Sequence, residues 1–143
     1  LGFCLSTLEA KEELLGPFLL NVQKELFIMG SNMACEETER EKYKLPQLEE
    51  SSIFEIEKMI DLLDGKLPKL TSFILPGGRE LAGRLHLCRT YTRKLERKLA
   101  NFDKNIEQAP VFYIRYLNRL SDLFFAAARY VNFLDKVEET KWP

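Results

Sequence analysis

The last third of the chain carries an apolar repeat with the period of a helix bundle. Its members recur at alternating steps of four and three residues, and they are Tyr113, Leu117, Leu120, Phe124, Ala127, Val131 and Leu134. Sustained over three heptads, this spacing is typical of a helix that packs along other helices. Pro110 suits the first turn of that helix, which we expect to continue to about residue 136. Because no segment shows the two-residue alternation of a strand, the sequence predicts an all-α antiparallel bundle.

Four earlier segments also have helical periodicity, which makes five helices if the first is counted. We expect them over residues 1–15, 17–30, 51–63 and 79–101. A Gly-Pro pair separates the first two, and a Gly-Ser-Asn run breaks or loosens the pattern of the second. Ser51 or Ser52 is expected to cap the third, with Glu55 as the capping-box partner of Ser52.

Three connections complete this outline. Residues 36–48 are polar and charged and are expected to form a surface connection. Residues 70–75 are too short and too close to Pro76 for a regular strand, so we expect a partly extended approach to the long helix. Residues 101–105 have the composition of a turn.

The length and composition fit one globular domain. The 143 residues suffice for a single domain over residues 1–143. An apolar fraction of 45% and a charged fraction of 30% are those of a folded chain rather than a disordered one. A net charge of −1 argues against a surface coated with positive charge for nucleic acid.

The compartment is predicted from the cysteines and from the missing membrane signals. Cys4, Cys35 and Cys88 match no zinc or redox spacing, so we expect reduced thiols in the cytoplasm. No run approaches the ~20 apolar residues of a bilayer span. The chain begins in mid-pattern without Met, so we expect upstream residues, and a transit segment among them would instead imply the mitochondrial matrix.

The helix expected over 79–101 is strongly basic on one side. His86, Arg89, Arg93 and Glu96 lie on a face away from its apolar stripe. At 1.5 Å per residue, Arg89 and Arg93 are about 6 Å apart along the axis. One interpretation is a solvated face with intrahelical ion pairs. The other is a polyanion site, because the rigid fork of an arginine binds two phosphate oxygens at once.

The last helix carries a matching polar pair. Asn118 and Asp122 are one turn apart and face the same way. If they share a crevice with Arg89 and Arg93, the site gains an amide for a base or ribose and a carboxylate near Mg²⁺ or an arginine.

Other kinds of site find little support. A dimetal carboxylate bundle needs paired Glu-x-x-His motifs, whereas His86 is the one histidine and has no Glu three residues before it. A lone histidine on a helix is usually a structural hydrogen-bonding group. The Pro76-Gly77-Gly78 turn lacks the ending of a Walker loop, and no nucleophile elbow is present.

Three blocks together resemble a known family. Thr71–Gly78 (TSFILPGG), Leu85–Arg97 (LHLCRTYTRKLER) and Tyr116–Arg129 (YLNRLSDLFFAAAR) are similar to the trimeric corrinoid adenosyltransferases. The resemblance implies a five-helix bundle assembled as a homotrimer, with active sites between subunits. It implies transfer of the 5′-deoxyadenosyl group of ATP to cob(I)alamin with Mg²⁺, giving adenosylcobalamin and triphosphate.

The resemblance also implies roles for individual residues. Phe73 matches the apolar residue below the corrin, which excludes the lower axial ligand of cobalt. Arg89 matches an arginine that pairs with an aspartate of a neighbouring subunit, and Arg93 matches one that contacts the ATP phosphates. Glu96, Asn118 and Asp122 match further residues of the family's site; we expect Glu96 and Asn118 to bind ATP and Asp122 to act with the two arginines. No metal ligand is assigned.

Two features of the family are absent from this chain. They are the glycine-rich ATP loop and the aspartate expected to pair with Arg89, and both would lie upstream of Leu1. Two alternatives to the enzyme remain open. One is a corrinoid carrier without turnover, and the other is a bundle whose basic helix binds acidic partners or nucleic acid.

Overall fold

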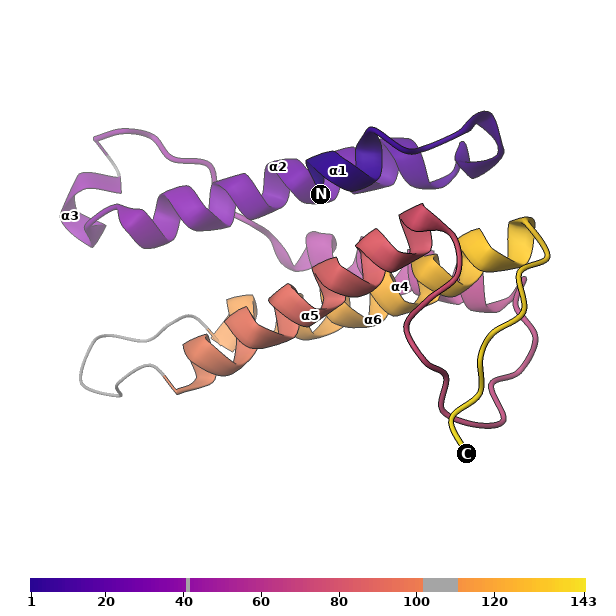
Figure 1. Cartoon of the computed structure of the whole chain (residues 1–143). Helices are drawn as coiled ribbons and strands as arrows, with labels where there is room; N and C mark the ends of the chain where they lie inside the picture. Colours follow the sequence, from indigo (N-terminus) through magenta and orange to yellow (C-terminus); the bar gives the residue numbers. More distant parts are fainter. Residues whose placement is uncertain (41, 102–110) are drawn as a thin grey trace.

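The computed structural model describes residues 1–40, 42–101 and 111–143, and the regular structure within them is helical. The helices are α1 (Gly2–Leu5), the 3₁₀-helix η1 (Ala10–Glu12), α2 (Leu15–Ala34), α3 (Glu37–Arg40), α4 (Glu50–Asp64), α5 (Glu80–Ala100) and α6 (Val111–Leu134). The four long helices run in alternating directions (Figure 1), so the antiparallel all-α prediction is confirmed. The described residues hold six α-helices, two of them only four residues long, so the expected count of five is not confirmed.

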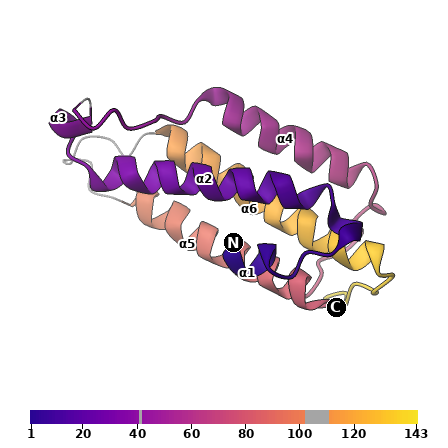
Figure 2. The ribbon, with the colours of Figure 1, turned by 90° about the horizontal axis from the view of Figure 1, so that it is seen from above.

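Helix α6 lies at the centre of the bundle. Both α4 and α5 pack against it, and α2 lies across it between them (Figure 2). The apolar repeat from Tyr113 to Leu134 forms the apolar seam of α6. The side chains of this seam are buried, except that Leu134 at its end is half-buried. Tyr116 links α6 to α2, since its Oη donates a 2.8 Å hydrogen bond to Glu25 Oε2. A helix enclosed on several sides needs apolar residues around most of its circumference, which explains the strength of the repeat.

The prediction of one helix over residues 1–15 is wrong. Between Leu1 and Leu14, only Gly2–Leu5 is α-helical, and a turn at Ser6 and Thr7 leads toward η1. Glu9 caps η1, with its backbone N–H donating to Glu12 Oε2 at 2.6 Å in a capping box. Glu12 is buried and forms an ion pair with Arg79. A tertiary partner therefore draws the acidic residues inward and overrides the local helical pattern.

Helix α2 begins at Leu15, with Pro17 in its first turn, and it passes through the expected break near residue 30. Asn32 is buried, and its Nδ2 donates to Pro46 O at 2.7 Å. Gln47 Nε2 donates to Asn32 Oδ1 at 2.6 Å. Because these bonds satisfy the asparagine from outside the helix, α2 continues to Ala34.

The start of α4 and the connection before it also differ from the prediction. Helix α4 starts at Glu50 with Glu49 as its N-cap, and the Ser52–Glu55 capping box does not form. Glu55 instead pairs with Lys58 at 2.8 Å. The surface connection at 36–48 contains the short helix α3. Most of the turn predicted at 101–105, and Pro110, lie outside the described residues.

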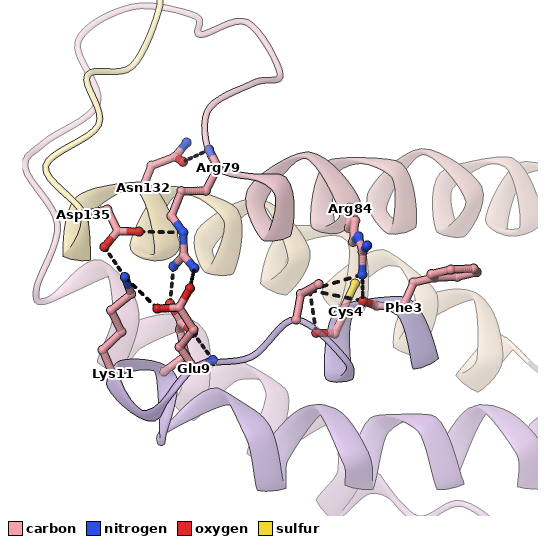
Figure 3. A network of polar contacts seen from close by, with 10 residues as sticks. Phe3, Cys4, Glu9, Lys11, Arg79, Arg84, Asn132 and Asp135 are labelled. Carbon is pink, nitrogen blue, oxygen red and sulfur yellow. Dashed lines mark hydrogen bonds and ion pairs between the residues drawn. The ribbon is translucent and has the colours of Figure 1, made fainter.

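An ion-pair network joins the start of α5, the end of α6 and the N-terminal segment (Figure 3). Arg79 contacts Glu12, Glu9 at 2.5 Å and Asp135 at 2.5 Å. Lys11 adds contacts to Asp135 and, at 3.0 Å, to Glu9. The hydrogen bond from Lys11 lowers the pKa of Asp135 below its usual value. The network fixes the end of the bundle from which residues 65–79 project.

Residues 65–79 connect α4 to α5 and meet the C-terminal segment. The predicted extended approach is confirmed, because Ile74 and Lys141 form an isolated antiparallel bridge. The Leu75 N–H donates to Thr140 O at 2.8 Å, and the Trp142 N–H donates to Phe73 O at 2.8 Å. No helix of the residues described here has the length and apolar character needed to cross a bilayer.

Candidate functional site

The polar row of α5 consists of His86, Arg89, Arg93 and Glu96. These residues share one face of the helix, as predicted. Arg89 and Glu96 are half-buried, and Arg93 lies between them along the axis and is exposed. The guanidinium carbon of Arg89 lies 5.2 Å from the centre of the Phe125 ring on α6. This cation–π contact holds the Arg89 head group over α6.

Asn118 and Asp122 form the polar row of α6. One of them, Asn118, contacts the polar row of α5. Asn118 Nδ2 donates a 2.9 Å hydrogen bond to Glu96 Oε1. Asn118 Oδ1 accepts a 3.0 Å hydrogen bond from Arg119, whose Nη2 also lies 3.4 Å from Asp122. Arg119 therefore joins the amide and the carboxylate that the sequence places one turn apart.

Two neighbouring grooves run over α6 between α4 and α5. The arginine groove has a volume of about 620 Å³, and its lining includes Asp64, Lys69, Arg89, Arg119, Asp122, Phe125 and Arg129. The amide groove, of about 400 Å³, is lined by Ile53, Glu57, Glu96, Ile114, Arg115, Asn118 and Arg119. Arg119 lines both grooves, and neither lining includes a residue of α2. The grooves therefore occupy the side of α6 that α2 leaves open.

The arginine groove contains more basic side chains than acidic ones. Arg129 is already paired, because its Nε donates to Glu139 Oε1 at 2.6 Å and its Nη2 donates to Pro68 O at 2.9 Å. The remaining positive charges are Lys69, Arg89 and Arg119, set against Asp64 and Asp122. An anion with several oxygens is the ligand that such a set of donors favours.

Phe73 stands apart from both grooves. Its side chain is 82% exposed, although its backbone is fixed by the bond to Trp142. The exposed ring is thus free to contact a ligand or a partner, and the fixed backbone determines where the ring lies. The structure thus brings Arg89 together with Asp122, and Glu96 with Asn118, but Phe73 and Arg93 line neither groove.

The turn that ends the Phe73 segment is locked by a buried asparagine. Asn132 Nδ2 donates to Gly77 O at 3.0 Å, and Asn132 Oδ1 accepts from the Arg79 N–H at 3.0 Å. Gly78 has a φ of +100°, and a Cβ there would lie 2.1 Å from Asn132 Oδ1. Only glycine fits this position, because L-residues rarely adopt such a φ and the asparagine fills the space.

His86 lies in the α5 row but beneath the 65–79 segment. It is 6% exposed, and its Nδ1 has no hydrogen-bond partner among the described residues. A cavity of about 20 Å³ beside it is also lined by Asn132 and Glu139. Burial and then the charge of Arg89 lower the pKa of His86, which favours a neutral ring. The ring centre lies 6.2 Å from that of Phe125, so the expected structural role becomes one of packing.

No group of three or more His, Cys, Asp or Glu side chains suited to a metal ion occurs in residues 1–40, 42–101 and 111–143. Asp122 is a carboxylate near the basic groove, and its side chain is 48% exposed. Mg²⁺ is commonly bound through one or two carboxylates together with substrate phosphates. Asp122 therefore supplies one carboxylate of the kind that such an ion uses.

Sequence reasoning missed several residues around the two rows. Arg119 and Phe125 fall inside the YLNRLSDLFFAAAR block but off the Asn118–Asp122 spacing, so periodicity gave no reason to select them. Asn132 was missed because its role depends on a turn more than fifty residues away in sequence. A polar residue on the buried side of an apolar seam is the signal that marks it.

The sequence model of the cobalamin adenosyltransferase family matches residues 1–131 of this chain. The corrinoid adenosyltransferase of Bacillus subtilis is 47% identical over 114 residues, which are 80% of this chain and 56% of that protein. The human corrinoid adenosyltransferase MMAB is 33% identical over 132 residues, covering 91% of this chain and 52% of that protein. The chain thus spans little more than half the length of these relatives.

Solved structures agree with the sequence match. A variant PduO-type ATP:corrinoid adenosyltransferase from Lactobacillus reuteri, complexed with cobalamin and ATP, superposes with a TM-score of 0.87 at 33% identity. The superposition covers 99% of this chain and 75% of that one. With a fold of four long antiparallel helices and a family match over most of its length, this chain belongs to the cobalamin adenosyltransferase family.

Proposed function

We propose that the protein to which this chain belongs transfers the 5′-deoxyadenosyl group of ATP to cob(I)alamin, giving adenosylcobalamin and triphosphate. The relatives named as corrinoid adenosyltransferases, and the related structure with cobalamin and ATP bound, support this reaction. The observation that carries the proposal is the meeting of two polar rows. Arg89 and Asp122 line one groove, while Asn118 and Glu96 are hydrogen-bonded in the next.

The arginines suit the leaving group of this reaction. Attack by cobalt on C5′ breaks the bond to triphosphate, so negative charge grows on the phosphate oxygens. Fixed guanidinium groups stabilise such charge because they need no reorganisation as it develops. We assign phosphate contact to Arg93, which is exposed on the row, and a supporting position to Arg89, which Phe125 holds in place.

The amide groove suits the nucleoside part of ATP. Asn118 offers an amide, and Glu96 offers a carboxylate whose second oxygen can accept a hydrogen bond from a hydroxyl group. We assign ATP binding to both, and to Asp122 a place beside the arginines and the magnesium that ATP brings. No general base is needed, because cob(I)alamin is itself the nucleophile.

Phe73 is assigned to the corrin. An exposed phenylalanine on a fixed backbone presents a rigid apolar face. Placed below the corrin, it would exclude the lower axial ligand of cobalt, and four-coordinate cobalt is easier to reduce to the Co(I) state.

We further propose that α1 with the four long helices forms the family's five-helix bundle, and that three copies assemble with active sites between them. Leu20 and Phe27 are exposed and lie a heptad apart on α2, which supplies apolar surface for a neighbouring subunit. Light scattering of the purified protein tests the trimer. The cytoplasmic location stays a prediction, to be tested by cell fractionation.

The reaction is tested by mixing the protein anaerobically with reduced cobalamin and Mg-ATP and following cob(I)alamin absorbance. ATP-dependent formation of adenosylcobalamin is the expected result. Cobalamin binding without turnover would instead indicate a carrier. Salt-sensitive binding of polyanions in general, without cobalamin binding, would indicate an interaction bundle.

A further inference from the structure

Two cysteines from distant parts of the sequence lie side by side where α1 meets α5. The Sγ atoms of Cys4 and Cys88 are 3.7 Å apart and hydrogen-bonded, although the two residues are 84 positions apart in sequence. Cys4 is buried and Cys88 is half-buried. The third cysteine, Cys35, follows α2, and its Sγ donates a 3.5 Å hydrogen bond to the carbonyl oxygen of Glu36.

A second contact one turn away holds the two cysteines in register. Arg84 on α5 donates hydrogen bonds to the carbonyl oxygen of Phe3 and, at 3.3 Å, to Thr7 Oγ1 (Figure 3). Its guanidinium carbon also lies 5.4 Å from the centre of the Phe3 ring. Because Phe3 and Thr7 flank Cys4, the arginine fixes that thiol opposite Cys88.

The pair has the asymmetry of a reactive dithiol. The hydrogen bond between the two thiols, opposed by burial, lowers the pKa of Cys88. The same hydrogen bond, together with burial, raises the pKa of Cys4. The half-buried member is therefore the better nucleophile near neutral pH, and the buried member is the thiol that would resolve a mixed disulfide.

We propose that Cys4 and Cys88 form a reversible disulfide that ties α1 to α5 in the presence of a disulfide oxidant such as oxidised glutathione. The Cys88 thiolate attacks one glutathione sulfur and expels the other glutathione as a thiolate. Cys4 then loses its proton and attacks the Cys88 sulfur, which breaks the mixed disulfide and expels the second glutathione. The two protein thiols lose two electrons and two protons in total, and one oxidised glutathione becomes two reduced ones.

The geometry permits this closure with a small movement. A disulfide requires a sulfur separation of about 2.05 Å. The two sulfur atoms are now 3.7 Å apart, so they must approach each other by less than about 2 Å. Helix α1 has four residues and is followed by a turn at Ser6 and Thr7, which leaves room for the adjustment. Closure would fasten α1 to the helix that carries Arg89 and Arg93.

The experiment is peptide mass mapping of the folded protein after treatment with oxidised glutathione, with free thiols alkylated at once. We expect a linked peptide pair containing Cys4 and Cys88, lost again on reduction with dithiothreitol, while Cys35 stays alkylated or carries glutathione alone. Closing a loop of this length should also raise the thermal unfolding midpoint by about 5–15 °C in the oxidised protein. These readouts need neither ATP nor cobalamin, so the inference stands or falls separately from the proposed reaction.

Matched variants sharpen the test. Cys35→Ser should form the same link, whereas Cys4→Ser should leave Cys88 as a stable mixed disulfide with glutathione. The proposal is overturned if the linked peptide is absent from the folded wild-type protein. It is also overturned if the link forms only in urea, because the thiols would then meet in the unfolded chain and not in the fold.

Discussion

Replacing Gly78 by alanine should destabilise the fold through a single turn. Gly78 has a φ of +100°, and its added Cβ would lie 2.1 Å from Oδ1 and 2.5 Å from Cγ of Asn132. Asn132 is only 5% exposed and uses both ends of its amide to hold the turn. A shift of this amide away from the added Cβ would break those bonds. Gly77→Ala is the matched control, because nothing lies within 4 Å of a Cβ there.

The magnitude follows from two contributions. Holding a non-glycine residue at such a φ costs about 1–2 kcal/mol. Losing two hydrogen bonds of a buried amide costs about 1–3 kcal/mol in total. We therefore expect Gly78→Ala to lower the free energy of unfolding by about 2–5 kcal/mol, and Gly77→Ala to change it by less than about 1 kcal/mol.

Urea unfolding followed by circular dichroism measures both variants, and the midpoints are compared at equal slope. A Gly78→Ala protein as stable as Gly77→Ala would refute the reasoning, because the asparagine would then not be fixed in the turn. The adenosyltransfer rate adds a second readout. Since the same turn ends the segment that carries Phe73, we expect Gly78→Ala to slow turnover and Gly77→Ala to leave it near wild type.

Three further predictions concern the site. Arg93→Ala should reduce the adenosyltransfer rate about 10²–10³-fold with an unchanged unfolding midpoint, since the side chain is exposed; Lys98→Ala on the same helix is the control, and a near-normal rate for Arg93→Ala would remove its phosphate role. Phe73→Ala should keep its stability, because the side chain is 82% exposed, but should lose the spectrum of four-coordinate cob(II)alamin; an unchanged spectrum would exclude Phe73 from the corrin site. Burial lowers the pKa of His86, so the unfolded chain binds the proton more tightly, and stability should fall as the pH drops below about 6.5. Urea midpoints measured between pH 7.5 and 5 should therefore decline in the wild-type protein and stay flatter in His86→Gln, whereas equal slopes would show that the ring titrates normally.

The sequence predicted the long elements because their patterns are strong and local. The seam from Tyr113 to Leu134 repeats over three heptads, and α6 follows it closely. The long basic helix was predicted at 79–101 and runs over Glu80–Ala100. In both cases the apolar stripe that forms the helix is the stripe that it buries, so local preference and tertiary packing agree.

The N-terminal segment was predicted wrongly because its decisive partners are distant. Leu1 to Leu15 has a helical apolar pattern, yet Glu12 pairs with Arg79, more than sixty residues later. Likewise, the Gly-Ser-Asn run near residue 30 lies within a helix because Pro46 and Gln47 satisfy the buried Asn32. No local propensity rule contains such partners, and each bond to a buried polar group outweighs a preference of a few tenths of a kcal/mol.

The sequence by itself determined the helical class, the long helices and the polar rows on α5 and α6, because these depend on spacing along one chain. The tertiary structure alone decided which side chains meet. It joined Asn118 to Glu96, set Arg89 over Phe125, placed Phe73 on a segment fixed by the C-terminus and brought Cys4 against Cys88. Periodicity gives the direction in which a side chain points from its own helix. The neighbour it finds there depends on how the helices cross and where the connections return, which the whole core sets together.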